Sequence, residues 1–232
     1  MKNFILLQLT IVLLLPCTGF SQGGWSTQHS GISTGLLSVH FINPNTGVCS
    51  GRQGKVVKTT NGGLNWEVLN TNSDMSLFSI WMLDSNLIIA CGKDRTVLRT
   101  TNGGHNWTRV TAIANGFDLT CVEFLNSTTG FITSWGGVLL RSTNAGLSWF
   151  EIWHPYVLSE ALSSISFVDE LTGYVAGDGA FGSNFSPFMK TTNGGLNWLR
   201  PIIPETGFIR DIDFMSPEDG LVCGSVNVLH TT

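Results

Sequence analysis

One eight-residue motif occurs four times in this chain and constrains its fold more than any other feature. The motif reads TTNGGLNW at 59–66 and again at 191–198, with the variants TTNGGHNW at 100–107 and STNAGLSW at 142–149. Its final tryptophans are spaced 41, 42 and 49 residues apart. A period of roughly 40 to 50 residues with strand-like content is typical of β-propeller blades. We therefore expect one blade for each repeat.

Each repeat also contains three short segments that favour strands. The first alternates polar and apolar residues, the second follows a glycine-containing turn, and the third leads directly into the motif. The motif then supplies the hairpin into a fourth strand. The first strands are expected at 37–41, 78–82, 120–124, 163–167 and 210–214. Five units of four antiparallel strands predict an all-β fold, a β-propeller with about five visible blades.

The motif follows the pattern [ST]-x-[DN]-x-G-x-x-W, which resembles the Asp-box, or BNR, repeat. Its Thr or Ser and its Asn have short side chains that can bond backbone groups within the turn. Its glycines permit positive φ, and its tryptophan can bury a large apolar area. Because the acidic position is asparagine in all four copies, we interpret the motif as structural. The residues are Thr59, Asn61, Gly63, Trp66, Thr100, Asn102, Gly104, Trp107, Ser142, Asn144, Gly146, Trp149, Thr191, Asn193, Gly195 and Trp198.

The two ends of the sequence carry complementary parts of one motif. Trp25 stands 14 residues before Val39, as Trp66 stands before Ile80, and HTT at 230–232 resembles the start of another copy. We expect the strand after Trp25 to complete the last blade, because an N-terminal strand commonly closes a propeller. A chain that stops inside this motif also suggests a gene fragment, incomplete at its C-terminus, of a larger propeller.

The first 22 residues, MKNFILLQLTIVLLLPCTGFSQ, have the layout of a secretory leader. One lysine precedes an apolar stretch that ends in small residues, which predicts a signal peptide at 1–21 and a mature propeller at 22–232. The apolar stretch is too short for a comfortable membrane span, and no later stretch could cross a membrane. We expect an exported protein: secreted, periplasmic or at the cell surface. Cys17 leaves a lipoprotein leader open, although Pro16 stands where a small residue is expected.

Composition narrows the classes of partner. Only 12% of residues are charged and the net charge is −4, without a long run of either sign. A nucleic-acid-binding surface would show clustered Lys and Arg, so nucleic acid is excluded. Export makes disulfides possible. However, three of the four mature cysteines sit at or beside one repeat position, too far apart to bridge, so we expect free thiols at Cys49, Cys91, Cys121 and Cys223.

The loops joining second and third strands gather on one face of a propeller, which is the default binding face. The loop at 177–188 is the longest of them. On this face we predict a cationic, aromatic patch suited to anionic or peptide partners, with scattered solvated charges as the alternative. The length of the long loop suggests a functional role, with a drifted insertion as the alternative. The candidate partner-binding residues are Arg52, Lys93, Arg95, Trp135, Asp178, Phe181 and Phe185.

One further set of basic residues recurs just before each motif. We interpret this position as a solvated strand edge, with a ligand-binding ring as the alternative. Its members are Lys58, Arg99, Arg141, Lys190 and His230.

Asp-box propellers include sialidases and xyloglucanase-type glycosidases, but no catalytic set assembles from this sequence. Sialidases need a tyrosine nucleophile, and Tyr156 and Tyr174 are not obviously paired with a glutamate. Asp211 and Asp213 have same-face spacing on a first strand, yet a paired-carboxylate mechanism needs a second, facing member. The five histidines show no metal-ligand spacing. We predict no catalytic, metal or cofactor-binding residue, and no cofactor.

The full repeat, LxSVxFxxxxTGxxxGxxGxVxKTTNGGxxW, resembles the photosystem II stability/assembly factor-like family of BNR propellers over nearly the whole mature chain. In that family, plant and cyanobacterial members act as assembly chaperones that hold a membrane-protein subunit. The resemblance implies a non-enzymatic module that binds or scaffolds a protein or a glycan. The alternative is a fragment of an Asp-box glycoside hydrolase, sialidase- or xyloglucanase-type.

Overall fold

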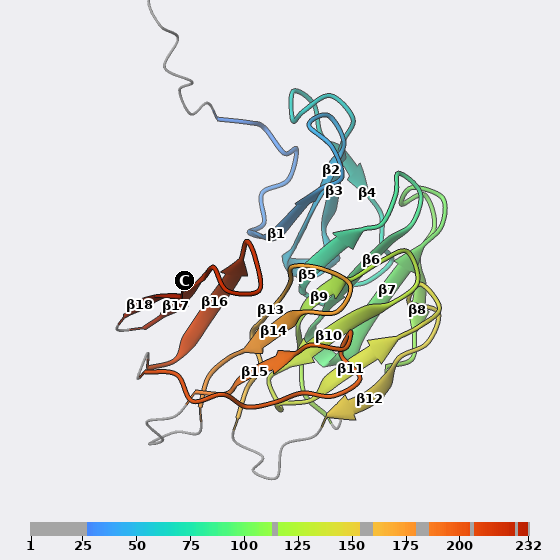
Figure 1. Ribbon diagram of the computed structural model, residues 1–232. Coiled ribbons are helices and arrows are strands. Elements are labelled where there is room, and N and C mark those ends of the chain that lie inside the picture. The colour runs from blue at the N-terminus through green and yellow to red at the C-terminus, as the bar shows by residue number, and fades with distance from the viewer. Residues whose placement is uncertain are drawn as a thin grey trace, which may run out of the picture.

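The computed structural model describes residues 27–112, 116–153, 160–179, 186–204, 207–225 and 227–231. In this part of the chain, strands form five antiparallel sheets that stand side by side in an arc (Figure 1). The predicted all-β propeller architecture with five repeats is confirmed. No helix among the described residues is long and apolar enough to span a membrane. The predicted leader, with Cys17, and Trp25 lie outside the described residues.

Every sheet is a meander in which consecutive strands are neighbours. The first contains β1 (Leu36–Phe41), β2 (Gly47–Gly51), β3 (Val56–Thr59) and β4 (Glu67–Leu69). The second contains β5 (Leu77–Met82), β6 (Ile88–Gly92), β7 (Thr96–Thr100) and β8 (Thr108–Val110). The third contains β9 (Leu119–Phe124), β10 (Gly130–Ser134), β11 (Leu139–Ser142) and β12 (Phe150–Trp153).

The last two sheets have three described strands each. The fourth contains β13 (Ser164–Phe167), β14 (Gly173–Ala176) and β15 (Phe188–Thr191), with a single bridge from Lys190 to Leu199 in place of a fourth strand. The fifth contains β16 (Ile209–Phe214), β17 (Gly220–Gly224) and β18 (Val228–Thr231). Two single-turn 3-10 helices, η1 (Arg52–Gly54) and η2 (Lys93–Arg95), join second to third strands in the first two sheets.

The hydrophobic core consists of four apolar layers, one between each pair of successive sheets. The second sheet turns Leu77, Ile80 and Met82 toward the first sheet, and these side chains are at most 2% exposed. Because side chains alternate along a strand, each middle sheet is apolar on both faces. The first strands pack against one another at the inside of the arc.

Successive first strands are also joined by hydrogen bonds from backbone to side chain. In each bond a backbone N–H of the later sheet donates to a side chain of the earlier sheet. The bonds join Ile80 N to Ser38 Oγ (3.3 Å), Met82 N to His40 Nδ1 (3.2 Å), Val122 N to Ser79 Oγ (3.1 Å), Phe167 N to Glu123 Oε1 (3.0 Å), Ile212 N to Ser164 Oγ (3.4 Å) and Phe214 N to Ser166 Oγ (3.2 Å).

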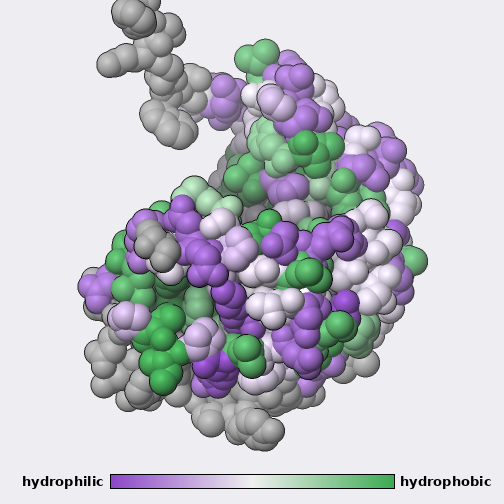
Figure 2. All heavy atoms as spheres, in the orientation of Figure 1, coloured by the Kyte–Doolittle hydropathy of each residue, from purple (hydrophilic) through white to green (hydrophobic). Residues whose placement is uncertain are grey.

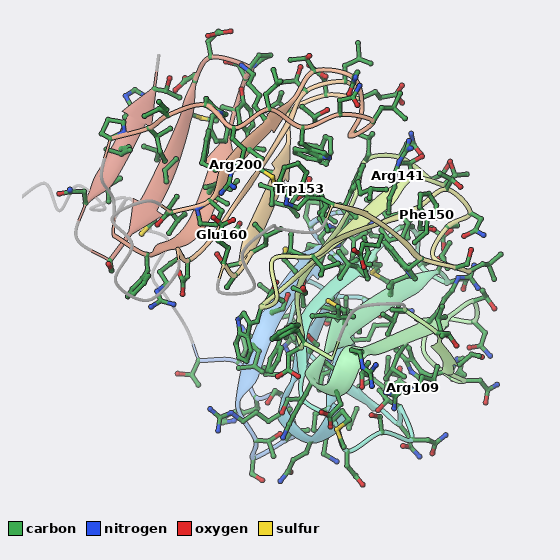
Figure 3. All side chains as sticks on the ribbon, turned by 90° about the horizontal axis from the view of Figure 1, so that it is seen from below. Arg109, Arg141, Phe150, Trp153, Glu160 and Arg200 are labelled. Carbon is green, nitrogen blue, oxygen red and sulfur yellow. The ribbon has the colours of Figure 1, made fainter. Side chains whose placement is uncertain are left out.

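The predicted closure of the ring by an N-terminal strand is not found in the described residues. Residues 27–35 contain no strand, and the fifth sheet ends at β18. The N-terminal segment instead follows the first sheet, because the Gly35 carbonyl accepts the N–H of Arg52 (2.9 Å) and Gly31 lies beside Val68. The arc is therefore open between the first and fifth sheets, as Figures 1 and 3 both show.

Candidate functional site

The eight-residue motif forms the same hydrogen-bonded turn in all four copies. In the first copy, Thr59 Oγ1 accepts the N–H of Gly63 (2.9 Å) and donates to Asn61 Oδ1 (3.0 Å). Asn61 Oδ1 also accepts the N–H of Asn65 (2.9 Å). The equivalent bonds at 100–106, 142–148 and 191–197 measure 2.9 to 3.1 Å. Because the side-chain oxygens are used inside the turn, the motif offers little chemistry to a ligand.

The tryptophan and the second glycine of the motif tie each turn to the sheets. Trp149 is 3% exposed and meets Phe124 of its own sheet edge-on, with ring centroids 5.7 Å apart. A Cβ added at Gly195 would lie 2.4 Å from Phe131 of the preceding sheet. The position accepts only glycine, since its φ of 74° is also left-handed.

The basic residues before the motif bridge to the next sheet, so the prediction of a solvated strand edge is wrong for three of them. Lys58 Nζ donates to the Ser85 and Gly103 carbonyls (2.8 and 3.2 Å), and Arg99 Nε donates to the Ala145 carbonyl (2.8 Å). These carbonyls belong to, or adjoin, the motif of the following sheet. The equivalent contact of Lys190 reaches the Pro217 carbonyl (3.3 Å).

The remaining two members of that set behave differently. Arg141, labelled in Figure 3, has a buried Nε without a hydrogen-bond partner among the described residues, although its guanidinium lies 5.9 Å from the centroid of the Phe131 ring. His230 pairs with Asp219 of its own sheet (2.9 Å). Because these five residues turn to different partners, they do not form a ligand-binding ring.

The five predicted partner-binding residues that the structure describes all lie on loops between second and third strands: Arg52, Lys93, Arg95, Trp135 and Asp178. Arg52 lies on η1, while Lys93 and Arg95 lie on η2, and all three side chains are exposed. η2 is also anchored at its centre, because Arg109 Nη2 donates to the Asp94 carbonyl (2.9 Å). Lys93, Arg95 and Arg109 therefore bring three positive charges to η2, a turn of the second sheet.

Trp135 is brought beside η2 by a residue that the sequence did not single out, Asp118. The Asp118 carboxylate accepts the N–H of Asp94 (2.9 Å), and its backbone carbonyl accepts the N–H of Trp135 (3.1 Å). The indole is 53% exposed and lies against Phe78, with ring centroids 5.5 Å apart. We call Phe78, Lys93, Arg95, Arg109 and Trp135 the Trp135 surface.

Phe78 was also missed from the sequence, although a signal was present. Leu77 and Phe78 are consecutive apolar residues at the start of an alternating strand. The register shifts between Leu77 and Ser79 in the pairing of β5 with β6, so Phe78 is the extra residue of a β-bulge. A bulge re-aims a side chain away from the regular pleat, which here places the Phe78 ring against Trp135.

The backbone of η2 is held in an uncommon conformation. Asp94 and Arg95 have φ values of 53° and 55°, in the left-handed region that non-glycine residues rarely adopt. The first sheet has Gly54 at the position of Arg95, with a φ of 66°. Such strain costs of order 1 kcal/mol per residue and gathers at functional sites. Arg95 therefore occupies a position at which glycine would be more stable.

The long loop contributes less to the described surface than predicted. Asp178 forms an ion pair with Arg210 (3.0 Å), so its charge is already compensated. Burial nevertheless raises the pKa of Asp178, and the nearby Arg210 opposes that rise. Phe181 and Phe185 lie outside the described residues. Further out, Arg200 and Glu160 form an ion pair (2.9 Å) between neighbouring segments (Figure 3).

A group of carboxylates lies at the inside of the arc. Glu123 is half-buried on β9, and burial raises its pKa to about 7. The N–H of Phe167 opposes this rise, whereas the charge of Asp213 adds to it. The sequence analysis named Asp213 on β16 but not Glu123, which lies on β9 and accepts the N–H of Phe167.

The histidine and the cysteines near the centre have different surroundings. Burial lowers the pKa of His40, whose ring lies 4.0 Å from the Trp81 ring between centroids. Burial also raises the pKa of the Cys49 thiol to about 11 and that of Cys121 to about 12. All four described cysteines are free, as predicted, but Cys223 is exposed. Among the described residues, no three His, Cys, Asp or Glu side chains gather as a metal site.

The sequence matches one protein family. Residues 19–115 match the family model described as photosynthesis system II assembly factor YCF48. This segment covers the first two repeats. No curated protein matches the chain.

Solved structures show the same fold. YCF48 from Cyanidioschyzon merolae is 19% identical, with a TM-score of 0.63 and coverage of 88% of this chain and 71% of that chain. An ancestral GH74 enzyme is 20% identical, with a TM-score of 0.63, and GH74 from Niastella koreensis is 16% identical, with a TM-score of 0.60. The chain covers only 28% and 34% of these two enzymes, against 81% and 80% of its own length.

These comparisons confirm the resemblance to photosystem II assembly factor-like BNR propellers. At these identities the solved structures establish the fold alone, and the GH74 enzymes share that fold.

Proposed function

We propose that this BNR-repeat propeller, similar to photosystem II assembly factors, is an exported, non-enzymatic module that binds a polypeptide on the Trp135 surface. Two lines support the proposal. The family model that matches residues 19–115 is that of a photosystem II assembly factor. The leader-like residues 1–21 support export.

The observation that carries the proposal is the exposed indole of Trp135 beside the cationic η2 turn. Interface hot spots are enriched in Trp and Arg that stand on a rigid support. Trp135 has that support, because Phe78 lies under its ring and Asp118 fixes its backbone to η2. Lys93 and Arg95 lie on η2, which Asp118 joins to the backbone of Trp135. Positive charge on this turn favours a partner segment that combines an apolar side chain with carboxylates.

The test is binding to an array of immobilised 15-residue peptides that vary in acidic and apolar content. Acidic peptides containing an aromatic or aliphatic residue are expected to retain the protein. Trp135→Ala should weaken that retention roughly tenfold or more, with an unchanged melting temperature. Leu147→Ala is the matched control, since Leu147 is 61% exposed on a motif turn. The proposal would be contradicted if Trp135→Ala and Leu147→Ala weakened peptide retention equally. It would also be contradicted if the protein bound immobilised glycans and none of the peptides.

A glycoside hydrolase activity is a second candidate, favoured by one observation. Burial raises the pKa of Glu123 to about 7, and the charge of Asp213 adds to that rise. Acid–base glycoside hydrolysis uses a pair of carboxyl groups, one of which is an acid with a raised pKa. Release of reducing sugar from sialosides or β-glucans, abolished by Glu123→Gln and by Asp213→Asn, would replace the binding proposal with this one.

A further inference from the structure

One cavity of about 640 Å³ lies between the third and fourth sheets. It is bordered by the turn from β9 to β10, the turn from β13 to β14 and the motif turn of the fourth sheet. Hydrophilic and apolar side chains are mixed over the face that Figure 2 shows, and the cavity combines the same two kinds of residue. We call it the Arg141 cavity, lined among others by Leu125, Arg141, Asp169, Glu170, Gly194 and Leu196.

At the first two interfaces between sheets, a basic side chain occupies the equivalent place. Lys58 Nζ donates to the carbonyls of Ser85 and Gly103 (2.8 and 3.2 Å), and Arg99 Nε donates to the carbonyl of Ala145 (2.8 Å). Gly103 and Ala145 are the fourth residues of their motif copies. At both interfaces, the basic residue before one motif is therefore bound to the next motif.

At the third interface the corresponding bonds are absent. Arg141, labelled in Figure 3, has a buried Nε without a partner among the described residues, and the ion pairs in that part of the chain involve other cations. The fourth motif residue is here Gly194, and Glu170 stands in the position of Ser85. No described residue donates a hydrogen bond to the carbonyl of Glu170 or of Gly194. One cation and two acceptors thus remain unpaired.

The residue across the strand explains why Arg141 differs from the two earlier basic residues. Those two lie across from Val48 and Ile89, whereas Arg141 lies across from Phe131. The Arg141 guanidinium is 5.9 Å from the centroid of the Phe131 ring. Attraction between a guanidinium and an aromatic face favours this position, which keeps the side chain on its own sheet and leaves the cavity open.

The Arg141 cavity can bind an anionic group and a cationic group together. The guanidinium presents a planar fork of N–H donors, which suits a carboxylate. The two carbonyls lie close to each other, because a Cβ added at Gly194 would be 2.9 Å from the Glu170 oxygen. At the first interface the equivalent pair of carbonyls holds the ammonium group of Lys58.

The other lining residues favour the same kind of ligand. The N–H groups of Thr172 and Leu171 lower the pKa of Asp169, which is therefore ionised at neutral pH. Asp169 and Glu170 are both exposed, and their negative charge attracts a cation and disfavours a ligand that is only anionic. Leu171 and Leu196 border the cavity and are 60% and 65% exposed, which favours an apolar group on the ligand.

We propose that the Arg141 cavity binds a small zwitterion with an apolar side chain, either a free α-amino acid or a dipeptide. The ligand carboxylate pairs with the Arg141 guanidinium. The ligand ammonium group donates to the Glu170 and Gly194 carbonyls, as Lys58 Nζ does to their equivalents at the first interface. The site shares no residue with the Trp135 surface, so it is independent of the peptide binding proposed there.

Isothermal titration calorimetry with L-leucine and with L-leucyl-L-leucine tests the proposal and distinguishes the two sources of the zwitterion. We expect at least one of them to bind with a Kd on the order of 1 mM or below. Two derivatives of the ligand that binds each lack one charge: the N-acetyl form lacks the ammonium group, and the C-terminal amide lacks the carboxylate. Each derivative should bind about tenfold more weakly.

Arg141→Met keeps the alkyl chain and removes the guanidinium. It should weaken binding of the zwitterion about tenfold but leave the affinity for the amide derivative unchanged, because the amide has no carboxylate to lose. A purely structural role of Arg141 would weaken both ligands equally. Arg99→Met is the matched control, since it lies at the same position of the preceding repeat and should leave zwitterion binding unchanged. Melting temperatures confirm that each variant is folded at the temperature of the titration.

Three results would overturn the proposal. The first is that neither zwitterion binds at concentrations up to about 20 mM. The second is that the two blocked derivatives bind as tightly as the zwitterion does. The third is that Arg141→Met has no larger effect on zwitterion binding than Arg99→Met, or weakens the zwitterion and its amide equally.

Discussion

Arg95 illustrates how one residue can work against stability and for binding. Its left-handed backbone replaces the glycine found at the same place in the first sheet. We expect Arg95→Gly to raise the free energy of unfolding by up to about 1 kcal/mol, because the strain is relieved. The same change should weaken peptide retention, because a cation of the Trp135 surface is lost. Denaturant titration and the peptide array measure the two effects; lower stability in the variant would show that the side chain packs structurally.

Glu123 is expected to make stability fall as the pH rises. Its pKa is about 7 in the folded chain, above the ordinary 4.5, so the folded state holds this proton more tightly than the unfolded state. Its contribution is fully present below about pH 4.5 and is lost as the pH rises through 7, amounting to at most about 3 kcal/mol.

Glu123→Gln tests this expectation without removing the acceptor of the Phe167 N–H. The variant should unfold at a higher temperature than the wild type at pH 8 and at nearly the same temperature at pH 4.5. His40 acts in the opposite sense, since its lowered pKa reduces stability as the pH falls below 6.5, but it is common to both proteins and cancels in the comparison. Glu67→Gln, on an exposed strand residue, is the control. A difference independent of pH would contradict the assignment.

At the scale of the element, the basic residues before each motif act as clamps between sheets. Arg99→Met keeps the alkyl chain but removes the bond from Nε to the Ala145 carbonyl, and should cost about 1 to 3 kcal/mol. Arg141→Met should cost less, because the Nε of Arg141 has no partner among the described residues. Thermal unfolding of the two variants makes the comparison. Equal costs would mean that packing of the alkyl chains, and not the hydrogen bond, holds the sheets.

The second glycine of the motif should be equally position-specific. Gly195→Ala brings a Cβ to 2.4 Å from the Phe131 ring at a left-handed φ, whereas Gly116→Ala has a φ of 83° and nothing within 4 Å. The first should destabilise by about 1 to 3 kcal/mol beyond the strain common to both. Calorimetry measures the unfolding of both variants. The difference between them gives the cost of the contact with Phe131, because the cost of the left-handed φ is common to both.

The repeats predicted the elements well because each element repeats its own local pattern. The first strand expected at 78–82 is observed as Leu77–Met82, and the motif turn forms in all four copies. Fourth strands were harder to place: in the fourth sheet, only Leu199 pairs before Pro201, whose ring removes a backbone donor. The candidate site depended on Asp118 and Phe78, which act across sheets. A single repeat contains no information about such contacts.

The whole molecule behaves as a short stack of sheets, in which each sheet contacts chiefly its neighbours. Stability in such arrays is nearly a sum of unit and interface contributions. The middle sheets have two covered faces and the end sheets one, so unfolding should begin at the ends. Hydrogen exchange measured along the chain should show the least protection in β16 to β18 and the most in β9 and β10. Uniform protection would indicate that the faces of the end sheets are covered in solution.

The bonds between first strands have a consistent direction, with the side chain always in the earlier sheet and the backbone in the later one. The clamps formed by Lys58 and Arg99 also join a side chain of the earlier sheet to the backbone of the later one, although in them the side chain donates and the backbone carbonyl accepts. The arc is therefore directional: through these contacts each sheet offers side chains to the sheet that follows it and backbone groups to the sheet that precedes it.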